Sequence, residues 1–470
     1  MLVNGIASMV LMLRTVCSLS VGRPLGRIGP ALDEEALSRV SRCMDFLDVS
    51  AEPFTCVSSV VRRLVKGGFQ ELDEKQGWSG RLQRGGKYFF TRNKSSIVAF
   101  AVGGKYSAGQ RFKIVGAHTD SPNLRVKPNS KKNPSNGLTQ VSVETYGGGL
   151  WHTWFDRDLS IAGRVLLRQN NTEGKSNFVH KLVKVDRPIL HIPNLCIHLR
   201  TPEEREAFKV NKEEHLVPIL CEEIKNSLTN KESSSDKNSE NSDPMATWTS
   251  NQSQELMETL SSELNCDIRD IVDFELSLYD TQKAAQGGAR KEFLTSSRLD
   301  NLASCFIAVE ALLDFAQKDL DSDSDVSMIA LFDHEEVGSD SYQGAGSTLM
   351  RDAVVRVNDA FQPGTTSQSE SFRSAIAKSL VLSVDMAHAI HPNYASKHEA
   401  NHAPKLNGGI VIKSNSNQRY ATNGLTSFFV RELARREEIP VQNFVVRNDC
   451  PCGSTIGPMY VSLHLIRLKR

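Results

Sequence analysis

The sequence predicts an α/β fold in which a mixed, twisted sheet is flanked by helices and carries an inserted β-rich domain. Short apolar runs alternate with helical periodicity in the second half of the chain, whereas short alternating segments and glycines fill its middle. At 470 residues the chain is also longer than one hydrophobic core usually grows. We therefore expect one domain from 33–122 and 288–470, with 123–287 inserted into it.

Helices should open the main domain, because apolar residues recur at helical spacing between 33 and 64. Two strands should follow at 88–90 and 96–102, where aromatic and β-branched residues precede a Gly-Gly turn. A helix through 302–313 and a strand at 326–332 continue the alternation. The acidic run 321–325 between them lacks the glycine turn and closing Glu of a calcium loop, so we expect a solvated connection.

The inserted region should be built mainly from strands. Residues 137–167 alternate in short segments that are broken at 147–149 by three glycines, and 188–199 is expected to form another, kinked strand. Residues 226–253 are rich in Ser, Asn and charge and poor in large apolar side chains. They should form a disordered loop.

Three apolar runs, 113–118, 328–336 and 380–385, are expected to be strands buried on both faces. Each ends in residues that ligate metals, and open α/β sheets place their ligand crevice at the carboxyl ends of the strands. Asp300 begins the helix that precedes the second strand. The side chains expected to converge are His118, Asp300, Glu335, Glu336 and Asp385.

This set has the chemistry of a metal site. One imidazole with several carboxylates suits zinc, with manganese or cobalt as alternatives, and one Asp could bridge two ions that clamp a water and a peptide carbonyl. The neighbouring Glu335 and Glu336 could divide the roles of ligand and general base. Singly, such residues are more often helix caps or core histidines.

A second motif, His398-Glu-Ala-Asn-His402, matches H-E-x-x-H, which requires both histidines on one face of a helix. Pro392 and Pro404 bracket it, and no apolar periodicity supports a helix. We expect no metal site there.

Composition restricts the partners and the compartment. With 56 Lys and Arg against 55 Asp and Glu, nothing favours nucleic acid or a membrane surface, and a peptide fits better. Nine cysteines without paired spacing, Cys450-Pro-Cys452 included, predict reduced thiols and a cytoplasmic location. Residues 1–32 contain Arg but no acidic residue, so organellar targeting or a disordered extension is the alternative.

From about 33 to 458 the sequence resembles the aspartyl aminopeptidases of metallopeptidase family M18. The motifs that carry this resemblance are 116–122 (GAHTDSP), 147–159 (GGGLWHTWFDRDL), 298–301 (RLDN), 333–339 (DHEEVGS), 385–394 (DMAHAIHPNY) and 447–458 (RNDCPCGSTIGP). The resemblance implies a zinc-peptidase catalytic domain that releases N-terminal Asp or Glu from peptides. It also implies a dodecamer in which the inserted domain makes contacts between subunits.

The resemblance also implies a role for each site residue. His118 and Asp385 would hold one zinc, Asp300 would bridge, and Glu336 would hold the second zinc. Glu335 would be the general base, and Asp120 would orient His118. The residues that would read the acidic side chain of the substrate are His198, His388, Lys413 and Tyr420.

The sequence departs from the family pattern after Pro458. The family continues with a Met-His-Ser-Ile-Arg-Glu motif that supplies the last zinc ligand, whereas 459–470 reads MYVSLHLIRLKR, with His464 outside such a motif. We expect an impaired second zinc site. The alternative functions are a subunit of low activity that assembles with full-length copies, and a metal-dependent deacylase or carboxypeptidase.

Overall fold

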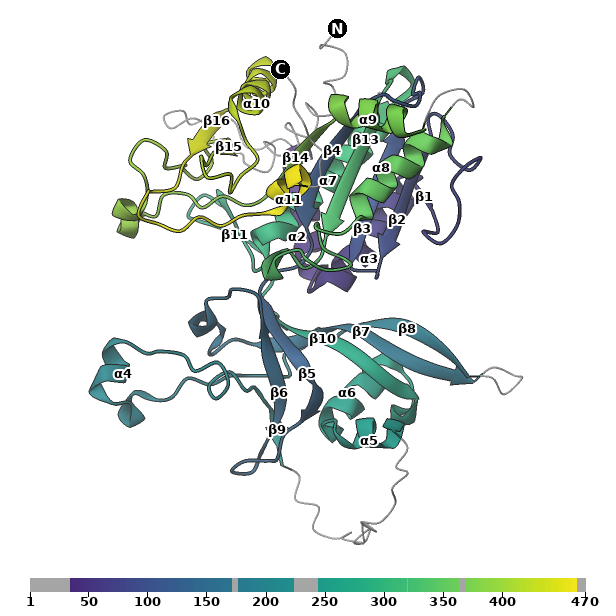
Figure 1. Cartoon of the computed structure of the whole chain (residues 1–470). Helices are drawn as coiled ribbons and strands as arrows, with labels where there is room; N and C mark the ends of the chain where they lie inside the picture. Colours follow the sequence, from purple (N-terminus) through teal and green to yellow (C-terminus); the bar gives the residue numbers. More distant parts are fainter. Residues whose placement is uncertain (1–33, 171–175, 224–243, 319, 363–367, 463–470) are drawn as a thin grey trace. The chain divides into compact units, whose positions relative to one another are not determined.

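The computed structural model describes residues 34–170, 176–223, 244–318, 320–362 and 368–462 (Figure 1). The chain divides into two compact units, one formed by Met1–Ser121 with Lys283–Arg470 and the other by Pro122–Gln282. The expected targeting segment 1–32 and His464 lie outside the described residues. None of the helices in the described parts is long and apolar enough to cross a membrane.

The first unit is built around a six-stranded mixed sheet. Its strands, in spatial order, are β1 (Gln70–Glu71), β2 (Lys87–Arg92), β3 (Ser96–Val102), β13 (Val326–Phe332), β4 (Phe112–His118) and β14 (Leu380–Ser383). Strand β4 pairs in parallel with both β13 and β14. Because the three strands are parallel, their carboxyl ends lie together at the same end of the sheet, as the sequence predicts.

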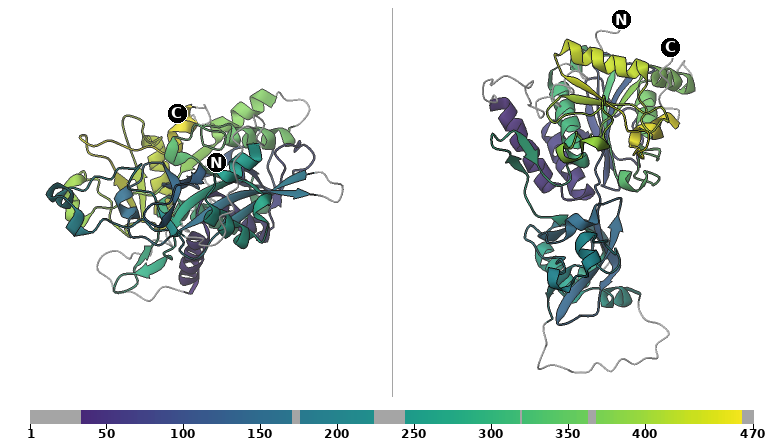
Figure 2. Two further views of the ribbon diagram at one scale, coloured as in Figure 1. Left: turned by 90° about the horizontal axis from the view of Figure 1, so that it is seen from below. Right: turned by 90° about the vertical axis from the view of Figure 1, so that its left-hand side faces the viewer.

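Helices cover both faces of this sheet, as expected for the predicted fold class. On one face pack α2 (Glu34–Val49), α3 (Pro53–Lys66) and α7 (Leu299–Lys318), and on the other α8 (Leu349–Ala360) and α9 (Gln368–Lys378). Figure 2 shows the purple helices α2 and α3 on the side of the sheet opposite to the green α8 and α9. Each large apolar side chain buried in this way contributes about 1.5–3 kcal/mol to folding.

Helix α3 begins at a residue whose side chain caps its free backbone N–H groups. Glu52 precedes α3, and its carboxylate accepts the backbone N–H groups of Phe54 and Thr55, both at 2.7 Å. Pro53 occupies the first turn, where its missing N–H leaves no bond unmade. The predicted helices at 33–64 and 302–313 are thus confirmed, the first as two helices.

Two predictions about this unit need correction. Strand β14 is half-buried and not buried on both faces, because it is the last strand of the six-stranded sheet. The run 321–325 is only partly a solvated connection: Asp321, Ser322 and Ser324 are exposed, whereas Asp323 and Asp325 are 8% and 1% exposed. The ammonium of Lys113, on β4, lies 2.8 Å from an Asp323 oxygen and 3.7 Å from an Asp325 oxygen, and this pairing buries the acidic side chains.

Smaller elements complete the first unit beyond the edge strand β14. A parallel pair, β15 (Ile410–Lys413) and β16 (Val441–Phe444), packs beside α10 (Gly424–Arg436). The remaining short elements are β11 (Ala285–Gly287), β12 (Phe293–Thr295), η4 (Leu320–Ser322), η5 (Glu335–Val337), η6 (Pro392–Lys397) and α11 (Ile456–Ser462).

The second unit is a six-stranded sheet with a helical cover on one side. The strand order is β8 (Ser176–Lys184), β7 (Leu159–Asn170), β10 (Ile271–Asp280), β5 (Asn123–Lys131), β6 (Leu138–Tyr146) and β9 (Ile219–Glu222). Residues of α5 (Pro244–Ser250) and α6 (Gln254–Leu264) pack against its core. The other helical turns are η1 (Trp151–Trp154), η2 (Ile197–Leu199), α4 (Pro202–Glu206) and η3 (Ile268–Asp270).

Two expectations for the second unit need correction. The segment 188–199 is not a strand: it makes only the isolated bridges Leu159–Leu190 and His191–Ile219 and then turns into η2. The expected disordered loop 226–253 is wrong for 244–253, which includes α5. Gln252 there is buried and its side-chain oxygen accepts a hydrogen bond from the Ser130 hydroxyl at 2.7 Å.

Candidate metal centre

The centre of the candidate site is His118, the last residue of β4, which is 1% exposed. Its Nδ1 lies 3.0 Å from the backbone oxygen of Asp120. Because a carbonyl oxygen only accepts hydrogen bonds, Nδ1 carries the proton, and in the neutral ring Nε2 has a free lone pair. Nε2 faces three carboxylates, with oxygens at 3.3 Å (Asp300), 3.8 Å (Asp385) and 3.9 Å (Glu335).

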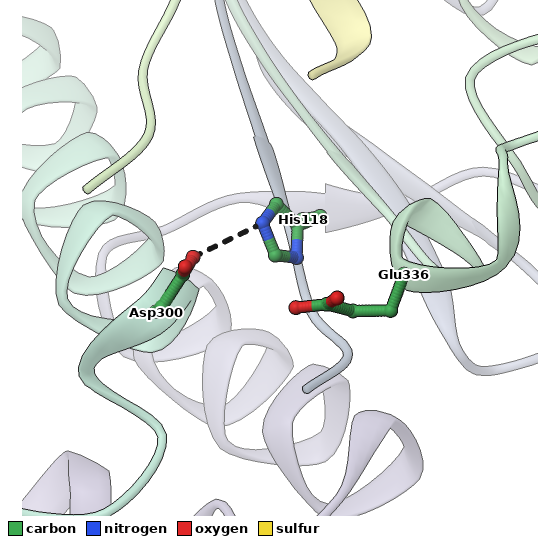
Figure 3. A group of neighbouring side chains, drawn as sticks. All are labelled: His118, Asp300 and Glu336. Atoms are coloured by element: carbon green, nitrogen blue, oxygen red, sulfur yellow. Dashed lines mark ion pairs between the residues drawn. The ribbon is translucent and has the colours of Figure 1, made fainter. Parts of the chain in front are cut away.

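Asp300 and Glu336 approach His118 from two different elements. Figure 3 shows the Asp300 carboxylate at the start of α7 directed at the imidazole, and the Glu336 carboxylate directed to the same region from η5. The side-chain amide of Asn301 donates to the backbone oxygen of Val384 at 2.9 Å. This bond fixes the residue after Asp300 to the residue before Asp385.

Asp120 fixes the turn that carries the two glutamates. It is fully buried, and its two carboxylate oxygens accept the backbone N–H groups of Glu335 at 3.2 Å and Glu336 at 3.1 Å. Its carboxylate oxygen also lies 3.4 Å from Nδ1 of His118. Asp120 therefore connects the imidazole to both glutamates.

The carboxylates repel one another in the absence of a cation. Burial, together with the charges of Asp385, Asp120 and Asp300, raises the pKa of Glu335 to about 7. Burial and the charges of Asp120, Glu335 and Asp300 raise the pKa of Glu336 to about 8. Burial lowers the pKa of His118, but its contacts with the carboxylates outweigh this and raise it well above the usual value.

These residues fit a metal ion. Two groups of three side chains have ligand atoms within 4.8 Å of one another among the described residues: His118, Asp300 and Glu336, and His118, Glu335 and Asp385. One oxygen of Asp385 is buried without a hydrogen-bond partner. Without a proton, Nε2 of His118 and the Asp300 oxygen are two acceptors only 3.3 Å apart, so a cation between such groups would stabilise the arrangement.

Three of the four predicted substrate-reading residues lie in the same unit as the cluster. The ammonium of Lys413 donates to the backbone oxygen of Met386 and acts electrostatically on Asp385 and His388. It lies 5.7 Å from the centre of the Tyr420 ring. His198 belongs to the second unit, where it is exposed in η2.

The H-E-x-x-H match forms no helix, as predicted. His398 follows η6 in an extended conformation, and the imidazole of His402 contacts Glu399 of its own motif. Both histidines of the match are absent from the metal-ligand groups found among the described residues.

Sequence reasoning missed side chains that support the site from outside the ligand set. Cys305 on α7 is buried, and its thiol donates to the backbone oxygen of His118 at 3.0 Å. Asn301 was quoted in a motif without a role. The role of Asn301 could have been suspected because it directly follows the candidate ligand Asp300. The sequence gives no indication of a role for Cys305, because the residue that it contacts, His118, is 187 positions away.

Comparison with known proteins gives one consistent family. Residues 46–467 match the family model described as aminopeptidase I zinc metalloprotease (M18). A probable aspartyl aminopeptidase of Ricinus communis is 48% identical over 438 residues, which cover 91% of this chain and 88% of the relative. An aspartyl aminopeptidase of Aspergillus oryzae is 45% identical over 454 residues, with 92% and 88% covered.

Solved structures agree with this result. Ape4, in a complex with Nbr1, superposes with a TM-score of 0.83 and 41% identity over 94% of this chain and 81% of that chain. The Saccharomyces mApe1 dodecamer gives a TM-score of 0.75 and 27% identity over 91% and 88%. The chain is therefore similar in both sequence and fold to zinc aminopeptidases.

Proposed function

Because the chain belongs to the M18 family of zinc metalloproteases, whose relatives include aspartyl aminopeptidases, we propose that it releases N-terminal Asp or Glu from peptides at the His118 cluster. The observation that carries the proposal is the convergence of one imidazole and four carboxylates at one sheet edge, with the Lys413 ammonium acting on Asp385. The positive charge of Lys413 beside the candidate metal site would attract the negatively charged side chain of an N-terminal Asp or Glu.

In this proposal His118 and Asp385 would hold one zinc, Glu336 would hold a second, and Asp300 would contribute to both. Zinc, when bound, acts as a Lewis acid on the peptide carbonyl and makes an attacking water more acidic. Manganese or cobalt would fit the same donor atoms. Asp120 keeps His118 in the tautomer whose Nε2 is free, and holds η5 through the backbone of Glu335 and Glu336.

Glu335 is the proposed general base. Its carboxylate lies 3.9 Å from Nε2 of His118 and is only 13% exposed. A base with a pKa near 7 balances ionisation at neutral pH against proton affinity, and burial places Glu335 in that range before a metal binds. Glu335 would accept the proton of the attacking water and deliver it to the amine that leaves.

Selectivity for the acidic side chain is assigned to Lys413, His388 and Tyr420 in the first unit, and to His198 in the second. A buried or half-buried cation leaves a neutral substrate with an unpaired charge opposite it, which penalises that substrate. Lys413 is the cation in this set, and its contact with the Met386 oxygen holds it next to Asp385.

A panel of anilide substrates tests the proposal. With zinc or manganese present, Asp- and Glu-anilides should be hydrolysed faster than Leu- and Ala-anilides, and N-acetyl-Asp-anilide should not be hydrolysed. Faster cleavage of Leu or Ala than of both acidic substrates would contradict it. A preference for the acetylated substrate would instead support the deacylase or carboxypeptidase alternative.

A homo-oligomer is part of the proposal, with the second unit making contacts between subunits. The support is the similarity to mApe1, whose solved structure is a dodecamer. Light scattering of the purified chain should give the mass of an assembly of many subunits. The alternative, a subunit of low activity, predicts the same mass but little turnover.

A further inference from the structure

The H-E-x-x-H match at 398–402 lies in the loop that follows the candidate ligand Asp385. Two hydrogen bonds give this loop a defined backbone. The backbone N–H of Ile390 donates to the backbone oxygen of Pro404 at 2.7 Å. The guanidinium of Arg447 donates to the backbone oxygen of Ser396 at 3.1 Å. The loop is thus closed on itself and is also joined to the segment between β16 and α11.

His398, the first histidine of the match, bonds to this loop through its ring. Its Nε2 accepts a hydrogen bond from the backbone N–H of His391 at 3.2 Å. The side chain of His391 is fixed in turn, because its Nδ1 accepts the backbone N–H of Asn393 at 3.1 Å and so caps η6. The ring of His398 therefore holds the backbone three residues after His388.

The His398 ring also contacts the side chain of His388. The centres of the two rings are 5.8 Å apart. Buried Phe444, the last residue of β16, supports His388 as well, with ring centres at 4.8 Å in a nearly perpendicular arrangement. The imidazole of His388 is exposed, so these two rings hold it while leaving it accessible to a substrate.

The second histidine of the match makes different contacts. The imidazole of His402 contacts the carboxylate of Glu399, which also accepts the backbone N–H of Asn401 at 3.0 Å. These contacts stay within the match itself. His402 therefore offers a control for His398 of the same residue type in the same loop.

From this arrangement we infer that His398 is a positioning residue that holds His388 in place for recognition of the acidic substrate side chain. The inference rests on the proposed function, because it needs His388 to contact substrate. Histidine combines the two properties that this position uses, a flat ring beside His388 and an acceptor for the N–H of His391. The first half of the H-E-x-x-H match thereby has a role other than metal binding.

The first test compares three variants of His398 with the control His402→Ala. His398→Ala removes both contacts and should raise KM for Asp-anilide about fivefold. Its kcat and its rate on Leu-anilide should change much less, because Leu has no carboxylate for His388 to contact. His398→Gln keeps an acceptor and His398→Phe keeps a ring, so each should raise KM only about twofold. His402→Ala should behave as the parent chain.

A double-mutant cycle with His388→Ala separates positioning from a general structural role. If His398 acts through His388, adding His398→Ala to His388→Ala should have little further effect on KM for Asp-anilide. Fully additive losses, equal losses on Asp- and Leu-anilide, or an unchanged KM in His398→Ala would overturn the inference.

Two further outcomes are distinguishable. If His398→Ala does not fold, His398→Gln and His398→Phe carry the comparison, and the KM of the parent chain in both would overturn the inference. A parent chain that does not prefer Asp-anilide would contradict the proposed function itself, and that result is obtained before any variant is compared.

Discussion

The proposed mechanism assigns different roles to two adjacent residues, Glu335 and Glu336. The backbone N–H groups of Glu335 and Glu336 are both held by Asp120, and each side chain joins a different ligand group with His118. Sequence could name both residues, because acidic residues after a buried strand form a recognisable pattern. It could not divide their roles, since that division depends on side-chain direction.

Exchange of each glutamate for glutamine tests the division. Glu335→Gln should retain metal and lower kcat by about a hundredfold or more, because it removes the base and keeps a polar side chain of the same shape. Glu336→Gln should lose metal as well as activity. Metal analysis of both purified variants decides the matter, and loss of metal in Glu335→Gln alone would mean that the roles are reversed.

The raised pKa values predict how metal binding depends on pH. In the metal-free chain Glu336, with a pKa of about 8, is mostly protonated at pH 6, and His118, whose pKa is raised well above the usual value, also carries an extra proton, so metal must displace a proton from each of these two ligands. Affinity for zinc should therefore rise from pH 6 to pH 8, by about tenfold per pH unit for each proton released. Calorimetry in two buffers of different ionisation enthalpy counts the protons, and zero release would refute this electrostatic description.

At the scale of elements, sequence patterns predicted the central strands well. Strands β3 and β13 have the bounds expected from their apolar runs, because residues buried on both faces leave a clear signal. The acidic run 321–325 was misread because its partner, Lys113, is 210 positions distant from Asp323. The second-unit segment 244–253 was misread because a polar composition hid a short helix that packs through Trp248.

The buried ion cluster yields a stability prediction. Lys113 lies between Asp323 and Asp325, all less than a tenth exposed. Lys113→Met should lower the free energy of unfolding by about 3–5 kcal/mol, because it leaves the buried Asp323 carboxylate without its cation, whereas Asp325 keeps the Arg111 guanidinium at 3.2 Å. Denaturant unfolding measures this, with exposed Lys94→Met, on the turn between β2 and β3, as the control. An equal small effect for both variants would show that the cluster contributes no net stability.

For the whole molecule, the ligand groups predict how many metal ions each chain retains. Both ligand groups in the described residues use His118, and its Nε2 has one lone pair, so a single imidazole cannot serve two ions. We expect about one tightly bound zinc per chain and a second ion that dissociates on dilution. Elemental analysis after gel filtration measures this. Two ions retained at full occupancy would point to a further ligand outside these two groups.

The fold class was predictable from the sequence. So was the convergence of the candidate ligands, because His118, Glu335 and Asp385 follow the ends of parallel strands and Asp300 begins α7. The inserted region was the expected place of His198, but its local structure was not predictable, because Ile197–Leu199 forms a helical turn where a strand was expected. The central part of the proposed function is the recognition of the negatively charged substrate side chain by the Lys413 ammonium.

The most direct measurement compares Asp-anilide with Asn-anilide, two substrates of nearly the same shape that differ in charge. We expect kcat/KM to favour Asp by about a hundredfold or more, since a neutral amide offers the Lys413 ammonium no opposite charge. We also expect Lys413→Met to lower the rate on Asp far more than the rate on Asn. Equal rates on both substrates in the parent chain, or an unchanged ratio in Lys413→Met, would contradict this charge recognition.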